Sequence, residues 1–191
     1  MSLGPIVVDA CVLLNLVSTG QEVRLIEALG AVLIVPPRAR AEARFLDEPP
    51  DEMGIPTVIP ANLVPLEAAG FLEVREVPAA GGRYADEYSR CRALTKVADA
   101  ECLALAGVSG FPLATDDKRQ RHLFSQLYAG RLLSTLELLR AAEQVLNLAE
   151  EELRAMLEEV FRKGGYRPPR EGRGLPLGEW YRGHLEAAGL V

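Results

Sequence analysis

Two short apolar segments near the N-terminus restrict the fold of this chain more than any other feature. Residues 5–8 and 31–35 are rich in β-branched side chains and have no polar residue at alternate positions. A strand covered on both faces has this continuous apolar pattern, whereas a half-exposed strand alternates apolar and polar residues. Residues 11–17 and 21–29 between them have helical spacing, with Gly30 as a suitable stop. This order of strand, helix and strand predicts a parallel sheet covered by helices.

The same alternation continues to about residue 146. Further strands are expected at residues 71–77, 111–115 and 131–133. Further helices are expected at residues 38–46, 63–69, 83–94, 97–106, 118–128 and 135–146. Thr95 is the expected cap of the helix at 97–106, and the segment from Gly107 to Gly110 is expected to break it. Residues 47–65 contain five prolines and predict a loop or an extended insertion.

The pattern predicts an α/β fold with two parts. Residues 1–146 are expected to form a three-layer sandwich around a central, mainly parallel sheet of four to five strands. Residues 147–191 are expected to form a C-terminal helical extension, packed on that unit or appended to it. The first helix of the extension carries a strong apolar stripe, with Asn147 as its expected cap, and a last short helix is expected near residues 178–188.

The composition indicates the cellular location of the protein and the kind of metal ion it could bind. No apolar run approaches the roughly 20 residues that a membrane span needs, and no basic segment precedes the first apolar stretch, so we expect a cytoplasmic protein that does not enter the membrane. Cys11, Cys91 and Cys102 lack CxxC spacing, which argues against a disulfide framework and a structural zinc site. With only two histidines, a metal site would consist mainly of oxygen ligands, which favours Mg²⁺ or Mn²⁺.

Acidic residues follow two of the expected strands directly. Asp9 ends the first strand, and Asp116 and Asp117 come straight after the strand at 111–115. The carboxyl ends of parallel strands share one edge of the sheet, so these side chains are expected to converge. Asp9 alone would fit equally well as a helix cap. Two adjacent aspartates repel each other unless a metal ion or a basic neighbour offsets the repulsion.

Two further acids lie in expected helices. Glu42 lies in the helix at 38–46, where it would also fit as a solvated surface residue. Asp99 lies in the first turn of the helix at 97–106, where it would also complement the helix dipole. Together with the strand-end acids, they provide enough carboxylates for one or two divalent cations. Such ions activate water and neutralise phosphoryl charge, which is what hydrolysis of a phosphodiester requires.

Four segments around these acids resemble the PIN-domain family, and more narrowly the VapC-type toxin ribonucleases and their relatives. The resemblance spans roughly residues 5–146 and rests on four segments: Val7-Val-Asp-Ala-Cys-Val-Leu-Leu-Asn-Leu16, Val35-Pro-Pro-Arg-Ala-Arg-Ala-Glu42, Asp99-Ala-Glu-Cys-Leu-Ala-Leu-Ala106 and Leu113-Ala-Thr-Asp-Asp-Lys118. Family members often have Thr or Ser directly after the first acid and Ser or Asn at the next position, where this chain has Ala10 and Cys11. A supporting hydroxyl is therefore expected to be missing there.

The resemblance implies roles for the acidic and polar residues of these segments. The implied catalytic residues are Asp9, Glu42, Asp99 and Asp117. The implied metal ligands are Asp9, Asp99, Asp116 and Asp117, with Mg²⁺ or Mn²⁺ as cofactor. Glu101 is implied as a partner or substitute of these acids. Thr115 and Asn15 are expected to supply supporting polar contacts, although Asn15 would fit equally well as a core polar residue with a backbone partner.

The formal net charge of −6 is unusual for a protein that binds nucleic acid, because Lys and Arg supply most of the affinity for phosphate. Local cations can still surround the acidic site. The candidate RNA-binding residues are Arg38, Arg40, Lys118, Arg119 and Arg121. The C-terminal aromatic residues Tyr166, Trp180 and Tyr181 could stack on bases, but we favour a packing role for the tail.

The sequence therefore predicts a divalent-metal-dependent endoribonuclease that hydrolyses RNA phosphodiester bonds. The VapC-like features extend this to the toxin of a toxin–antitoxin pair, with an antitoxin protein and a second copy of the chain as candidate partners. The alternative is a non-catalytic PIN-like scaffold that binds a protein partner or RNA, which Ala10, Cys11 and the C-terminal segment favour.

Overall fold

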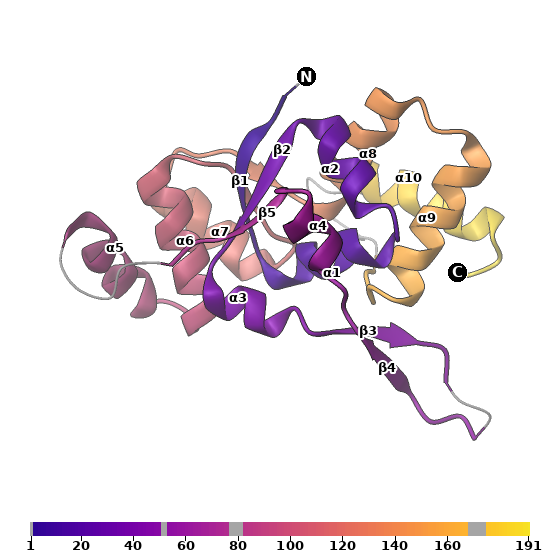
Figure 1. The fold of residues 1–191 in the computed structure, drawn as a ribbon, viewed down its shortest axis with the longest axis horizontal. Helices are drawn as coiled ribbons and strands as arrows, with labels where there is room; N and C mark the ends of the chain where they lie inside the picture. Colours follow the sequence, from indigo (N-terminus) through magenta and orange to yellow (C-terminus); the bar gives the residue numbers. More distant parts are fainter. Residues whose placement is uncertain (1, 51–52, 77–81, 168–174) are drawn as a thin grey trace.

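The computed structural model describes residues 2–50, 53–76, 82–167 and 175–191. Its centre is a parallel sheet with the strand order β5-β2-β1-β6-β7 (Figure 1). The strands are β1 (Gly4–Val8), β2 (Ala31–Val35), β5 (Leu72–Val74), β6 (Leu113–Ala114) and β7 (Leu132–Leu133). The predicted α/β fold with a mainly parallel sheet is confirmed.

Helices cover both faces of the sheet. One group contains α1 (Ala10–Ser18), α2 (Glu22–Leu29), α4 (Val64–Ala68) and α8 (Thr135–Leu146), in which α2 contacts the other three. A second group contains α5 (Gly82–Arg92), α6 (Val97–Ser109) and α7 (Lys118–Leu127), in which α6 contacts both neighbours and strands β1 and β6. Ile6, Val7 and Val8 of β1 are completely buried between these layers, as their uninterrupted apolar pattern predicted.

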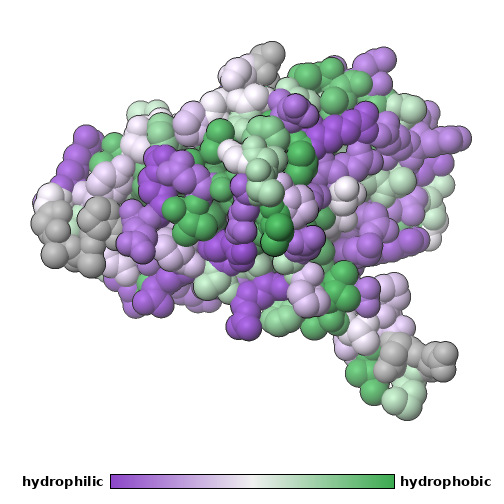
Figure 2. All heavy atoms as spheres, viewed as in Figure 1, coloured by the Kyte–Doolittle hydropathy of each residue, from purple (hydrophilic) through white to green (hydrophobic). Residues whose placement is uncertain are grey.

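The segment after β2 differs from its prediction. The expected helix at 38–46 is only α3 (Pro37–Glu42), which ends beside Ala43. The chain then forms an antiparallel hairpin of β3 (Phe45–Glu48) and β4 (Thr57–Pro60), which projects from the body (Figure 1). Figure 2 shows hydrophobic side chains on this hairpin, and Phe45 and Val58 are about half exposed. The proline-rich insertion is therefore partly a strand pair.

Three helix ends also differ from their predictions. Thr95 does not cap α6; Lys96 is the capping residue, and the Thr95 hydroxyl instead donates to Asp99. Within the segment 107–110 that was expected to break α6, the helix continues past Gly107 to Ser109, and Gly110 ends it in a left-handed conformation. A side chain at Gly107 would collide with the ring of Tyr128, so this glycine permits close packing. Asn147 ends α8 in a left-handed conformation (φ 49°) and does not cap the next helix.

The C-terminal helices α9 (Glu150–Arg162) and α10 (Leu175–Ala187) pack on the rest of the molecule. Leu153, Met156, Leu157 and Val160 form the buried stripe of α9, which contacts α1. Tyr181 of α10 is completely buried, and its hydroxyl donates to the Leu157 carbonyl at 3.1 Å. These contacts bring the segment that follows α9 close to α1. Among the described helices, none combines the length and apolar character needed to cross a bilayer.

Candidate active site

The order of the strands places one crevice at the carboxyl ends of β1 and β6. In the sheet, β1 has β2 on one side and β6 on the other. The connection that follows β1 leads to β2, and a later connection leads to β6, so the chain connections diverge between β1 and β6. Open parallel sheets bind ligands at such a switch point. Asp9 follows β1 and Thr115 follows β6 at this edge. Two of the four catalytic acids implied by the resemblance, Asp9 and Asp117, come from these strand ends.

Asp9 is the N-cap of α1 and is 7% exposed. Its Oδ1 accepts a hydrogen bond from the Ala10 backbone N–H at 2.7 Å. Its Oδ2 accepts from the Cys11 thiol at 3.1 Å and from the Thr115 hydroxyl at 3.2 Å. Burial raises the pKa of Asp9, and the charge of Asp99 raises it further, although these donors oppose the shift. The Asp9 side chain thus caps α1, while burial disfavours its ionised form.

Glu42 and Asp99 lie close enough to Asp9 for their charges to interact. Burial, followed by the charges of Asp9 and Asp99, raises the pKa of Glu42, and Glu101 adds to the effect. The charges of Asp9 and Asp99 therefore act on Glu42, so acids from the end of β1, from α6 and from α3 lie within electrostatic range of one another. Like charges held together in this way disfavour the ionised forms.

The start of α6 is fixed from both sides. The Thr95 hydroxyl donates to Asp99 Oδ2 at 2.8 Å. The completely buried Gln120 of α7 directs its Nε2 toward the Asp99 carbonyl at 3.5 Å, while its Oε1 has no partner among the described groups. Thr95 and Gln120 were not predicted as site residues. Gln120 stands in a charged helical segment, where nothing in the sequence signals a buried amide.

Asp116 and Asp117 point in different directions although they are adjacent. Asp116 accepts hydrogen bonds from the Thr135 backbone N–H at 3.0 Å and hydroxyl at 2.5 Å, and from Asn15 Nδ2 at 3.3 Å. Burial raises the pKa of Asp116 against these donors. Asp117 is exposed, caps α7 through the Gln120 N–H, and donates its own N–H to the Thr115 hydroxyl. The pair that sequence could not separate is therefore separated by geometry.

Cys11 occupies the position where a supporting hydroxyl was expected to be missing. Its thiol donates to Asp9 Oδ2, so a weak donor stands beside the acid. Burial raises the pKa of the Cys11 thiol well above its usual range, and the charges of Asp9 and Asp116 add to this. The thiol therefore stays protonated and acts as a donor. Cys91 and Cys102 are buried, as expected of core thiols.

The candidate RNA-binding cations have different partners in the structure. Arg38 forms an ion pair with Glu101 (3.4 Å) at the rim of the acidic cluster. Arg40 instead binds Glu67 at 2.9 Å, on α4. Arg119 donates to the Leu94 carbonyl, and Arg121 donates to the carbonyls of Thr115 and Leu133 at 2.9 Å. Arg121 therefore holds the ends of β6 and β7 together.

Two lysines stand beside the acids. Lys118 lines a pocket next to Asp116. Lys96, the residue at the N-cap position of α6, carries a charge that opposes the rise in the pKa of Glu42. Lys96 was not predicted as a site residue, although its position three residues before Asp99 on an acid-led helix is a signal that could have identified it.

The acids suit a hard divalent cation. In the described ranges, no three His, Cys, Asp or Glu side chains stand in a ready-made metal-binding arrangement. The available donors are carboxylate oxygens, which Mg²⁺ and Mn²⁺ prefer. The mutual repulsion of Asp9, Glu42 and Asp99 is the kind that a bound cation relieves.

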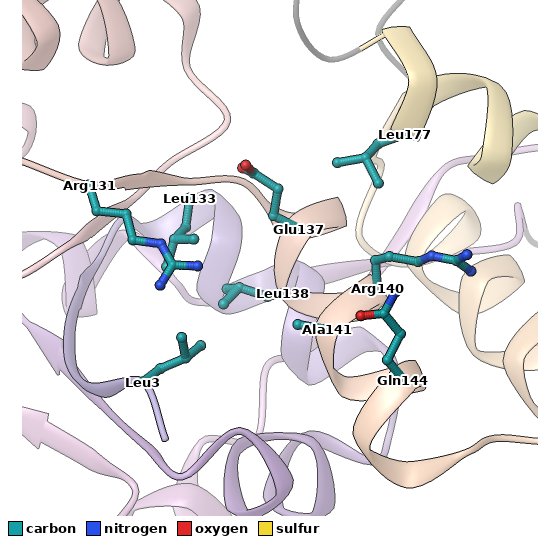
Figure 3. Close-up of a pocket in the computed structure, with 9 residues that line it drawn as sticks. All are labelled: Leu3, Arg131, Leu133, Glu137, Leu138, Arg140, Ala141, Gln144 and Leu177. Carbon is teal, nitrogen blue, oxygen red and sulfur yellow. The ribbon is translucent and has the colours of Figure 1, made fainter. Parts of the chain in front are cut away.

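Two pockets lie near the edges of the sheet. One, of about 330 Å³, adjoins the acidic site and is lined by Cys11, Asn15, Asp116, Lys118, Gly164, Gly165, Tyr166 and Arg167. The other, of about 210 Å³, lies between β7, α8 and α10 (Figure 3). Leu3 and Arg131 of the second pocket precede β1 and β7, so it opens at the amino ends of the strands, away from the acids.

Comparison with models of protein families, with curated proteins and with solved structures finds no match for this chain.

Proposed function

We propose that this chain is a divalent-metal-dependent endoribonuclease of PIN type. The observation that supports the proposal is that Asp9 lies at the switch point of a parallel sheet, within electrostatic range of Asp99 and Glu42, and that burial and the neighbouring acids raise the pKa of Asp9 and Glu42. A protein that keeps such acids together without a use for them would lose stability. The resemblance of the four acid-bearing segments to the PIN family supports the same conclusion.

The proposed ligands of Mg²⁺ or Mn²⁺ are Asp9 and Asp99, with Glu42 and Asp117 completing the set. When bound, the ion would supply an activated water and neutralise charge on the phosphoryl oxygens. Thr115 orients Asp9 and fixes the backbone N–H of Asp117, so it connects the two strand ends. We assign Asp116 a supporting role, because its two oxygens already bind Thr135 and Asn15.

We extend the proposal to the setting of the enzyme. A cytoplasmic location, inhibition by an antitoxin protein and assembly into a homodimer are each consistent with a toxin ribonuclease. Arg38, which pairs with Glu101, and Lys118, which lines the pocket beside Asp116, are the candidate cations that would meet the RNA backbone. Arg40 pairs with Glu67, and Arg119 and Arg121 donate to backbone carbonyls, so we propose a structural role for these three.

The test is cleavage of mixed RNAs by the purified chain with Mn²⁺ or with EDTA. Cleavage is expected with Mn²⁺ and not with EDTA, and Asp9→Asn and Asp117→Asn should each lower the rate at least about 100-fold, a typical loss for a group that stabilises transition-state charge. Asp86→Asn, the same change on the exposed surface of α5, should cleave at the wild-type rate.

Cleavage that persists in EDTA, or in both site variants, would refute the proposal. Tight binding of RNA or of a protein partner without any cleavage would instead support the non-catalytic scaffold. Cys11 in place of a hydroxyl beside Asp9 is the observation that favours this second candidate.

A further inference from the structure

The pocket beside Asp116 is built from two parts of the chain that are far apart in sequence. Cys11, Asn15 and Asp116 come from the switch point, and residues 164–167 come from the segment that follows α9. The C-terminal extension thus forms one wall of a pocket whose other wall is the acidic site. Its volume of about 330 Å³ is within the range that holds a small ligand or a nucleotide-sized group.

Close packing fixes the wall formed by the extension. A side chain at Gly164 would come within 2.6 Å of Asn15 Oδ1 and 3.0 Å of Ser18 Oγ, so only glycine allows the loop to lie against α1. The Lys163 carbonyl accepts from the Asp47 N–H of β3 at 2.8 Å. The ring of Tyr166 contacts the buried Tyr181 edge to face, with centroids 5.5 Å apart.

Arg167 brings a positive charge to this pocket. No carboxylate of the described residues forms an ion pair with it. Its Nη1 donates to the carbonyls of Phe161 (2.9 Å) and Tyr166 (3.2 Å), and its guanidinium lies over the Phe161 ring at 4.1 Å. These contacts are with neutral groups, and they hold the guanidinium in place while Nε and Nη2 make no hydrogen bond to the described residues. The arginines and lysines just before it differ: Arg162 pairs with Glu158 and Lys163 with Glu159.

The pocket offers the guanidinium of Arg167, the ring of Tyr166 and the amide of Asn15 beside the proposed nuclease site. These groups suit the binding of one nucleotide. Arginine binds phosphate through parallel N–H donors, and an ordered arginine loses little conformational entropy on binding. Aromatic rings stack on bases of single strands. Asp116 also lines the pocket, but donors from Thr135 and Asn15 already satisfy its oxygens, which lessens its repulsion of a phosphate.

We propose that this pocket binds the nucleotide next to the cleaved bond of a single-stranded RNA, with Arg167 on its phosphate and Tyr166 on its base. The inference rests on the proposed function for the identity of the substrate. It makes the C-terminal extension part of the substrate site and not only a packed appendage.

The test measures binding of a fluorescein-labelled single-stranded RNA of about 12 nucleotides to the full chain in EDTA, at several salt concentrations. Cleavage is not expected in EDTA, so binding is measured whether or not the chain is a nuclease. Arg167→Ala should weaken binding about 5- to 10-fold and reduce the salt slope by about 0.7, the value for one phosphate on a single strand. Tyr166→Leu should weaken binding by a similar factor without changing the salt slope, because stacking releases no counterions.

Arg162→Ala is the matched control, because Arg162 is an exposed arginine of α9 that already pairs with Glu158. It should bind RNA like the wild type, and all three variants should show the wild-type circular dichroism spectrum. Wild-type affinity and slope in Arg167→Ala would overturn the proposal, as would an equal loss in Arg162→Ala. If Arg167→Ala loses the expected affinity but the wild type does not cleave RNA with Mn²⁺, the pocket stands and the proposed nuclease activity falls.

Discussion

Asp9 shows why a single residue can have a capping role and a chemical role at once. Its Oδ1 caps α1, and its Oδ2 receives the Thr115 hydroxyl and the Cys11 thiol. Three donors would normally favour the ionised form, yet burial outweighs them and raises the pKa of the side chain. The ionised carboxylate is thus less stable in the folded protein than in the unfolded chain.

This imbalance predicts how pH affects the metal-free protein. A carboxyl whose pKa is raised by folding binds more protons in the folded state, so stability is lost as pH rises through that pKa. Asp9, Glu42 and Asp116 all shift in this direction. We expect these three groups to lower the free energy of unfolding in EDTA as pH rises from about 4 to about 7, against the opposite contributions of Glu73 and Glu87, whose pKa values are lowered by hydrogen bonds. Urea unfolding at a series of pH values measures it.

Asp9→Asn should make the metal-free protein more stable at neutral pH, on the order of 1 kcal/mol, and should reduce the pH dependence. Asparagine caps a helix as well as aspartate does but carries no charge to bury. Urea unfolding of the variant and the wild type in EDTA provides the comparison. A less stable variant would show that the hydrogen bonds to Asp9 outweigh its burial.

Thr115 is expected to stabilise the fold through its hydroxyl. The side chain is completely buried, donates to Asp9 Oδ2 and accepts from the Asp117 N–H. Thr115→Val keeps the shape but leaves both partners short of a hydrogen bond, so it should lower the free energy of unfolding by about 1–3 kcal/mol. Chemical denaturation measures this, with Thr115→Ser as the control that restores the hydroxyl. Equal stability of the valine and serine variants would contradict the account.

At this scale the sequence predicted the residues that follow a strand but missed those that pack from elsewhere. Asp9 and Thr115 could be placed because a strand end fixes their position. Gln120 reaches the site through the packing of α7 against α6, which no local pattern contains. The donor role of Cys11 was also missed, because a thiol in an apolar segment is typical of the core.

Among the elements, α10 offers the clearest test of how the extension is attached. The Tyr181 ring is completely buried, and its hydroxyl binds the Leu157 carbonyl of α9. Tyr181→Phe should lower the free energy of unfolding by about 1 kcal/mol, and Tyr181→Ala by about 3–5 kcal/mol. Denaturant unfolding gives both values. An alanine variant as stable as the wild type would mean that α10 does not pack on α9.

The ends of elements were harder to predict than their cores. The helix expected at 38–46 stops at Glu42, because the chain turns there into the β3–β4 pairing, which joins residues nine to fifteen positions apart. Asn147 has the composition of an N-cap, but its left-handed backbone ends α8 instead. Both positions depend on the conformation of the following segment, which a single residue type does not specify.

For the whole molecule, the sequence predicted a parallel sheet but not the order of its strands. The apolar runs of β1 and β2 require covered strands, which requires helices on both faces. Which strand lies beside β1 is decided by long-range packing, and it is the pairing of β1 with β6 that brings Asp9 to Thr115. The contact between Asp9 and Thr115 therefore followed from topology, while the different orientations of Asp116 and Asp117 did not.

The central claim is that acids from β1, α3, α6 and the end of β6 form one site for a divalent cation. Calorimetric titration of Mn²⁺ into the metal-free wild type and into Asp9→Asn at pH 7 tests it most directly. We predict saturable binding to the wild type and a loss of at least about tenfold in affinity in the variant, since a ligand carboxylate is removed. No binding to the wild type, or equal affinity in Asp9→Asn, would contradict the account.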